Sequence, residues 1–131
     1  MEEKFREHGI KITPQRLELI KKLKELEKYH PSFNDVYNAV EATCPSVSRS
    51  TVHGNLKLLV ELGIIKNFHY NGEVRYEMNS EPHVNLAESN GKIRDIENDE
   101  IKKHLAEIGR ILNEEEKIKF KTIMVLVEDQ N

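Results

Sequence analysis

The chain has 131 residues, a formal net charge of −3 and one cysteine. A single cysteine excludes an intramolecular disulfide and any zinc site that needs several thiolates from one chain. No apolar run is long enough to span a bilayer and charged residues follow Met1 directly, so we expect a soluble, cytoplasmic protein without membrane contact.

The N-terminal part predicts two helices. Residues 3–9 are typical of a short helix that ends at Gly9. Thr13 and Pro14 are a strong start signal for a second helix, which we expect to end near Lys28. Its apolar residues have the spacing of an amphipathic helix and are expected to face the core: Leu17, Ile20, Leu23 and Leu26.

Two further helices follow. Ser32 is a suitable N-cap for a helix that continues through Thr43, and Ser48 is a suitable N-cap for one that ends near Leu62. Gly63 has the residue type that commonly terminates a helix. The expected inward-facing residues are Val36, Tyr37 and Val40 in the first helix, and Val52, Leu56 and Leu59 in the second.

A hairpin is predicted directly after the last of these helices. Residues 64–70 and 73–78 are prone to form strands, and Asn71-Gly72 between them is a strong signal for a tight turn. Three core helices followed at once by a two-stranded ribbon indicate a winged helix-turn-helix.

The remaining residues predict a small unit of mixed structure. Short strands are expected at 84–87 and 92–96, a helix at 97–111 and a strand at 118–127. A unit of about 50 residues buries too little surface to be stable alone, so we expect it to pair with a second copy.

The predicted fold class is therefore α+β. We expect a winged-helix DNA-binding domain over residues 1–79, a linker over 80–83 and an α+β dimerisation domain over 84–131. Residues 1–80 hold 12 basic and 11 acidic side chains, whereas residues 81–131 hold 8 and 12. This asymmetry is compatible with a front half that approaches an anion, and it is small enough to arise by chance.

The third long helix is the candidate recognition helix. The residues on its polar face can contact base edges and phosphates in a major groove, although a plain solvated helix surface is the alternative: Arg49, Ser50, His53, Gly54 and Lys57. The predicted wing favours DNA, but winged helices also bind proteins. No nucleophile–base motif, phosphate-binding loop or dinucleotide fingerprint is present, so we do not expect an enzyme.

Several stretches resemble the ferric uptake regulator (Fur) family. They are Gly9 to Arg16, His30 to Tyr37, Ser48 to Leu56, Leu62 to Ile65 and Gly91 to Asp95. The resemblance implies a homodimeric, metal-responsive DNA-binding regulator, usually a repressor. A two-fold dimer would bind a roughly palindromic operator in double-stranded DNA. Three residues within these stretches are added as candidate DNA contacts: Arg16, Thr51 and Asn55.

The resemblance also implies a regulatory metal site. Carried over by position, the ligands are His30, Glu77, His83 and Asp95, and Asn85 stands where the family has a third histidine. Two imidazoles and two carboxylates suit iron(II) or manganese(II), and also zinc(II). Asn85 would be a weak ligand through its amide oxygen. Each residue alone could equally be an ordinary loop or strand residue, and a regulator that has lost metal control is the alternative.

Three departures from the family pattern matter. The paired Cys-x-x-Cys motifs that hold a structural zinc in most members are missing, so we expect no structural zinc and assign Cys44 to a helix end. His53 and Gly54 replace the tyrosine and polar residue usual in the recognition helix, and Gly54 costs the helix about 1 kcal/mol relative to alanine. Asp95, where other members have glutamate, favours the peroxide-responsive branch of the family.

Overall fold

The computed structural model describes residues 1–78 and 81–130. The chain divides into two compact units, Met1–Asn79 and Ser80–Asn131. The first contains α1 (Glu2–Glu7), α2 (Pro14–Leu26), the 3₁₀ helix η1 (Glu27–Tyr29), α3 (Phe33–Thr43), α4 (Arg49–Glu61), β1 (Lys66–Tyr70) and β2 (Glu73–Glu77). The second contains β3 (His83–Ala87), β4 (Ile93–Ile96), α5 (Asp99–Glu114) and β5 (Met124–Glu128).

The helix boundaries in the first unit follow from N-caps. The side chains of Thr13, Ser32 and Ser48 each accept a hydrogen bond from a backbone N–H in the first turn of α2, α3 and α4. At α3 the Asp35 carboxylate accepts a bond from the Ser32 N–H in return, which completes a capping box. The predicted helix starts are therefore confirmed.

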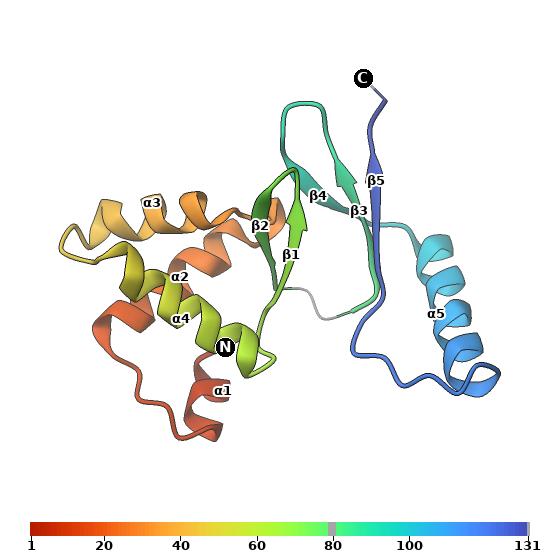
Figure 1. Ribbon diagram of the computed structural model, residues 1–131, viewed down its shortest axis with the longest axis horizontal. Coiled ribbons are helices and arrows are strands. Elements are labelled where there is room, and N and C mark those ends of the chain that lie inside the picture. Colours follow the sequence, from red (N-terminus) through yellow and green to blue (C-terminus); the bar gives the residue numbers. More distant parts are fainter. Residues whose placement is uncertain (79–80, 131) are drawn as a thin grey trace. The chain divides into compact units, whose positions relative to one another are not determined.

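The helices of the first unit lie beside the hairpin that follows them (Figure 1). They share one hydrophobic core with it. Thirteen buried apolar side chains form it, from Phe5 in α1 to Tyr76 in β2. The predicted inward position of Leu17 is wrong, because this side chain is 45% exposed and Leu19 is buried instead. The residues that α2 buries are Leu19, Ile20 and Leu23, so the helix face toward the core does not include Leu17.

The hairpin forms as expected. Strands β1 and β2 pair antiparallel with Lys66 opposite Glu77 and Tyr70 opposite Glu73. Asn71 and Gly72 in the turn both have positive φ, 50° and 77°, as a tight hairpin turn requires. Together with the helices before it, this hairpin makes the first unit a winged helix-turn-helix.

In the second unit, a three-stranded sheet is accompanied by α5 (Figure 1). The strand order is β4-β3-β5; β3 pairs antiparallel with β4 and parallel with β5. The expected strand at 118–127 is too long, because β5 begins only at Met124. The Ile118 N–H instead donates to the Leu112 carbonyl at 2.8 Å, and Phe120 packs against Gly109 of α5. Residues 118–120 therefore contact α5 and are not part of the strand.

None of the helices in the described residues is long and apolar enough to cross a membrane.

Candidate functional site

His30 lies directly after η1, in the loop that precedes α3. Its backbone is left-handed, with φ 44° and ψ 68°, a conformation in which histidine is found more often than most residues. The same loop is fixed on the hairpin, because the Tyr76 N–H donates to the Pro31 carbonyl at 2.9 Å and Ser32 forms a β-bridge with Arg75. The loop and β2 therefore hold the imidazole in one place.

Glu77 ends β2 beside this imidazole. Its Oε2 lies 2.8 Å from Nδ1 of His30, and the two residues are 2% and 0% exposed. A buried carboxylate is costly unless hydrogen bonds or a nearby positive charge stabilise it. Burial lowers the pKa of the Lys66 amine opposite Glu77, and the Glu77 charge raises it. The pair is an acid–imidazole contact of the kind found at metal and catalytic sites.

A second group of polar side chains lies on one face of the sheet in the other unit. His83 and Asn85 are alternate residues of β3, and Asn85 is the register partner of Asp95 on β4. Nε2 of His83 lies 3.3 Å from Oδ1 of Asp95. The strand pairing therefore brings three of the predicted ligands together.

A backbone carbonyl selects the tautomer of the neutral His83 ring. Its Nδ1 donates to the carbonyl oxygen of Glu81 at 2.6 Å. In the neutral imidazole this leaves a lone pair on Nε2, directed at the carboxylate of Asp95. Two electron-rich atoms this close require a proton or a cation, and a histidine that donates its other N–H to a carbonyl is the usual arrangement of a metal ligand.

Asn85 supplies an independent indication. The residue is fully buried, and neither its Oδ1 nor its Nδ2 has a hydrogen-bond partner within residues 1–78 and 81–130. An unsatisfied buried amide costs about 1–3 kcal/mol. Its carbonyl oxygen suits a weak metal ligand beside His83 and Asp95. Ligation of a metal ion would offset the cost of the unsatisfied amide.

The structure thus places the five sequence-predicted positions in two groups. His30 and Glu77 meet within the first unit; His83, Asn85 and Asp95 meet within the second. Sequence reasoning missed the Glu81 carbonyl, since a backbone group carries no sequence signal. It also missed Phe68, whose ring meets the His30 ring edge-on with centroids 6.2 Å apart.

The candidate DNA-binding residues on α4 form one exposed row. Ser50, His53, Gly54 and Lys57 are all exposed and have the spacing of a single helix face. The residues that anchor α4 to the core lie on its other side: Val52, Leu56 and Leu59. The exposed row is the surface that the helix can present to a groove.

The other predicted DNA contacts are engaged inside the domain. Arg16 donates from Nε to Oδ1 of Asn55 at 3.0 Å and from a guanidinium NH to the Lys11 carbonyl at 2.8 Å, which ties α2 to α4. Thr51 is half-buried, and its hydroxyl accepts a hydrogen bond from Ser48 at 2.8 Å.

Arg49 is held against α3. Its guanidinium carbon lies 5.0 Å and 4.7 Å from the ring centroids of Phe33 and Tyr37, and it donates to Oδ1 of Asn34 at 2.8 Å. These contacts orient the start of α4.

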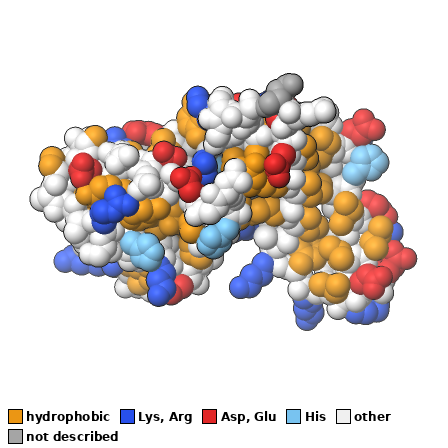
Figure 2. Space-filling view, turned by 45° about the horizontal axis from the view of Figure 1, so that its top comes forward, with side chains coloured by type: hydrophobic (Ala, Val, Ile, Leu, Met, Phe, Trp, Pro, Cys, Tyr) orange, Lys and Arg blue, Asp and Glu red, His pale blue; other side chains and the backbone are white. Residues whose placement is uncertain are grey.

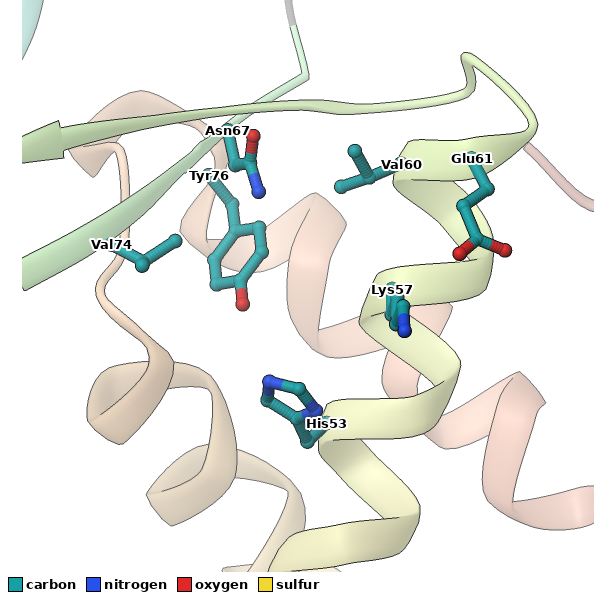
Figure 3. Close-up of a pocket in the computed structure, with 7 residues that line it drawn as sticks. All are labelled: His53, Lys57, Val60, Glu61, Asn67, Val74 and Tyr76. Atoms are coloured by element: carbon teal, nitrogen blue, oxygen red, sulfur yellow. The ribbon is translucent and has the colours of Figure 1, made fainter.

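A pocket of about 360 Å³ separates α4 from the hairpin (Figure 3). His53, Lys57, Val60 and Glu61 line it from α4, and Asn67, Val74 and Tyr76 line it from β1 and β2. Burial raises the pKa of the Tyr76 hydroxyl, so this group stays neutral. The lining thus combines two basic side chains, one acidic side chain and apolar groups.

The sequence matches the ferric uptake regulator family over residues 7–127. A ferric uptake regulation protein homolog from Archaeoglobus fulgidus is 35% identical over 129 residues, covering 98% of this chain and 94% of the relative. A peroxide-responsive repressor, PerR, from Staphylococcus aureus is 32% identical over 95 residues, covering 71% of this chain and 64% of the relative.

A solved structure shows the same fold. The ferric uptake regulator from Pseudomonas aeruginosa with manganese superposes with a TM-score of 0.74 over 99% of this chain and 98% of the other, at 23% identity.

Proposed function

Because the chain belongs to the ferric uptake regulator family, whose members are transcription regulators and not enzymes, we propose that it is a metal-dependent DNA-binding repressor that senses iron or peroxide. One observation carries the metal part of the proposal: each unit holds an imidazole against a carboxylate, and the buried Asn85 amide lacks a partner in the described residues. The proposed operator is a palindrome bound by a homodimer.

We infer that one divalent ion takes ligands from both units. By position in the family, His30, Glu77, His83 and Asp95 would each offer one ligand atom, with Asn85 as a weak addition. Iron(II) and manganese(II) suit this nitrogen and oxygen set best, and zinc(II) also fits. The ion would supply the positive charge that the two carboxylates need. Ligands on both units would fix their relative orientation and favour the DNA-binding form.

Calorimetry with manganese(II) and metal-free protein tests whether one ion uses both groups of ligands. The wild-type protein is expected to bind one regulatory ion per chain. His30→Ala in the first unit and His83→Ala in the second should each remove that same ion. Two ions that are lost independently, one with each variant, would contradict a shared site.

Restoring the third histidine is expected to strengthen the site. In Asn85→His, an imidazole replaces an amide oxygen that is a poor ligand, so we expect manganese(II) or zinc(II) to bind roughly tenfold more tightly. Calorimetric titration of wild type and variant measures the difference. Asn85→Leu is the matched control, because it removes the unsatisfied amide and should raise the thermal stability of metal-free protein while weakening metal binding. Unchanged metal affinity in both variants would place Asn85 outside the site.

Lys57 is expected to contact a DNA phosphate. Lys57→Ala should weaken binding to all sequences alike and lower the slope of log affinity against log salt by about 1. The measurement is fluorescence anisotropy over a salt series. Lys103→Ala, which removes an exposed lysine from α5, is the control and should leave the slope unchanged. An unchanged slope for Lys57→Ala would exclude the phosphate contact.

Peroxide sensing is the finer proposal, supported by Asp95 and by the similarity to a peroxide-responsive repressor. Iron(II)-loaded protein exposed to hydrogen peroxide should gain one oxygen atom on His30 or His83, read by peptide mass spectrometry. Manganese(II)-loaded protein is the control and should stay unmodified. Intact histidines in both samples would favour sensing of the metal itself.

A regulator without metal control is the second candidate. The observation in its favour is Asn85, which occupies a position where the family pattern has an imidazole. In that case DNA binding would persist unchanged in chelator and in His83→Ala.

A further inference from the structure

Nothing within its own unit explains why residue 54, Gly54, is a glycine. It is an interior residue of α4, it is exposed, and a Cβ built on it would meet nothing within 4 Å. Its φ lies outside the left-handed range that favours glycine. Gly109 of α5 is the useful contrast, because a Cβ there would come within 3.2 Å of Cζ of Phe120. Packing therefore explains Gly109 and leaves Gly54 unexplained.

Gly54 is placed in the middle of the exposed row on α4. Ser50 and His53 precede it and Lys57 follows it, so polar side chains flank a point where the helix backbone is bare. His53 and Lys57 also line the pocket beside the hairpin (Figure 3). The exposed row therefore has no side chain at Gly54, which lies in the first half of α4. The N-terminal part of a recognition helix is the part that contacts base edges.

We propose that Gly54 is a specificity-determining position whose bare Cα packs against the C5-methyl group of a thymine in the major groove. This inference rests on the proposed DNA-binding function. The amide and carbonyl of an interior helical residue are taken up by the helix, so only C–H groups remain to face outward. The C5-methyl group of thymine is the apolar feature of the major-groove edge and is the group that such a surface recognises.

The first test separates stability from binding. The probe is a DNA duplex recovered by in vitro selection from a random-sequence pool with manganese(II)-loaded wild-type protein. In Gly54→Ala, the better helix former should raise Tm by about 2–5 °C. The added methyl should lower affinity for the selected duplex about tenfold, the usual size of one disrupted base-pair contact.

Asn38→Ala is the matched control. Asn38 is an exposed interior residue of α3, and its replacement by alanine also improves a helix of the same unit. It should raise Tm and leave affinity for the selected duplex unchanged. A loss of binding in Gly54→Ala alone therefore reflects the added methyl group rather than a stiffer domain.

The second test exchanges the methyl group between DNA and protein. Deoxyuridine, which lacks the C5-methyl, is placed at each thymine of the selected duplex in turn. At one thymine per recognition helix, wild type should lose about fourfold in affinity, the equivalent of one buried methyl group. Gly54→Ala should instead bind that uracil duplex more tightly than the thymine duplex, because its own methyl fills the space.

The failures are distinguishable. Wild-type protein from which no duplex is selected, with or without metal, would overturn the proposed function itself. Wild type that binds a selected duplex, but with Gly54→Ala at equal affinity or with no thymine position sensitive to uracil, would overturn only the role of Gly54.

Discussion

His83→Ala is expected to bind manganese(II) at least about 100-fold more weakly than wild type, and to lose the increase in DNA affinity that metal produces. The imidazole is oriented by the Glu81 carbonyl and faces Asp95 at 3.3 Å, so its removal takes away a held ligand and not a freely rotating side chain. Loss of a group that only orients a metal ligand typically costs about 10–100-fold in metal affinity. Calorimetry and anisotropy on the same samples measure both effects.

His104→Ala is the matched control for this variant. His104 is on α5 with a side chain 75% exposed, and its contact with Glu100 is a surface pair. Its removal should leave metal binding and DNA binding unchanged. If His83→Ala also kept its metal-enhanced DNA binding, His83 would not be a regulatory ligand and the regulator without metal control would be favoured.

Ile108→Asp is expected to give a monomer that binds DNA about 10²- to 10⁴-fold more weakly, because the second recognition helix is no longer linked to the first. Ile108 and Ile111 of α5 are 44% and 36% exposed, and Met124 and Val127 of β5 are 36% and 45% exposed. Hydrophobic side chains gather at the surface of this unit (Figure 2). An exposed apolar surface of this kind commonly marks a protein–protein interface, and members of the family act as dimers.

The small core of the second unit supports the same prediction. Within its described residues, the buried apolar side chains are Ala87, Ile93 and Leu105, against thirteen in the first unit. Sedimentation measures the oligomeric state, and circular dichroism checks that the variant keeps its helices. Ile108→Leu is the control and should remain dimeric. A helical, dimeric Ile108→Asp would show that α5 lies outside the interface.

The sequence was most informative where a local interaction sets the structure. Thr13, Ser32 and Ser48 begin helices because each side chain bonds to the first turn, and Asn71-Gly72 turns because both residues tolerate positive φ. None of these features depends on distant parts of the chain, so motif and spacing were enough to predict them.

Prediction was weakest where tertiary packing decides. Alternation at 118–121 indicated a strand, yet Phe120 packs against Gly109 of α5 and β5 starts at Met124. Leu17 had the correct spacing for a core position, but Leu19 occupies it. In both cases, packing within the folded unit decides the structure of residues whose local sequence pattern allows more than one outcome.

The candidate metal ligands came from family resemblance, and the structure adds their local chemistry. Strand register explains why Asn85 and Asp95 share a face, which spacing alone did not establish. The proton on Nδ1 of His83 depends on a backbone carbonyl, and the engagement of Arg16 and Arg49 depends on contacts with Asn55, Phe33 and Tyr37. The contacts of Arg16 and Arg49 join residues distant in the chain. The His83 contact is local but is made to a backbone carbonyl, so none of these contacts carries a sequence signature.

The most direct test of metal-dependent DNA binding is the affinity of wild-type protein for its selected duplex, with manganese(II) and with chelator, at one salt concentration. Coupling between two sites typically amounts to 5–150-fold, so we predict at least about a tenfold tighter complex with metal. By reciprocity, the duplex should tighten metal binding by the same factor. Equal DNA affinity in metal and in chelator would contradict the account.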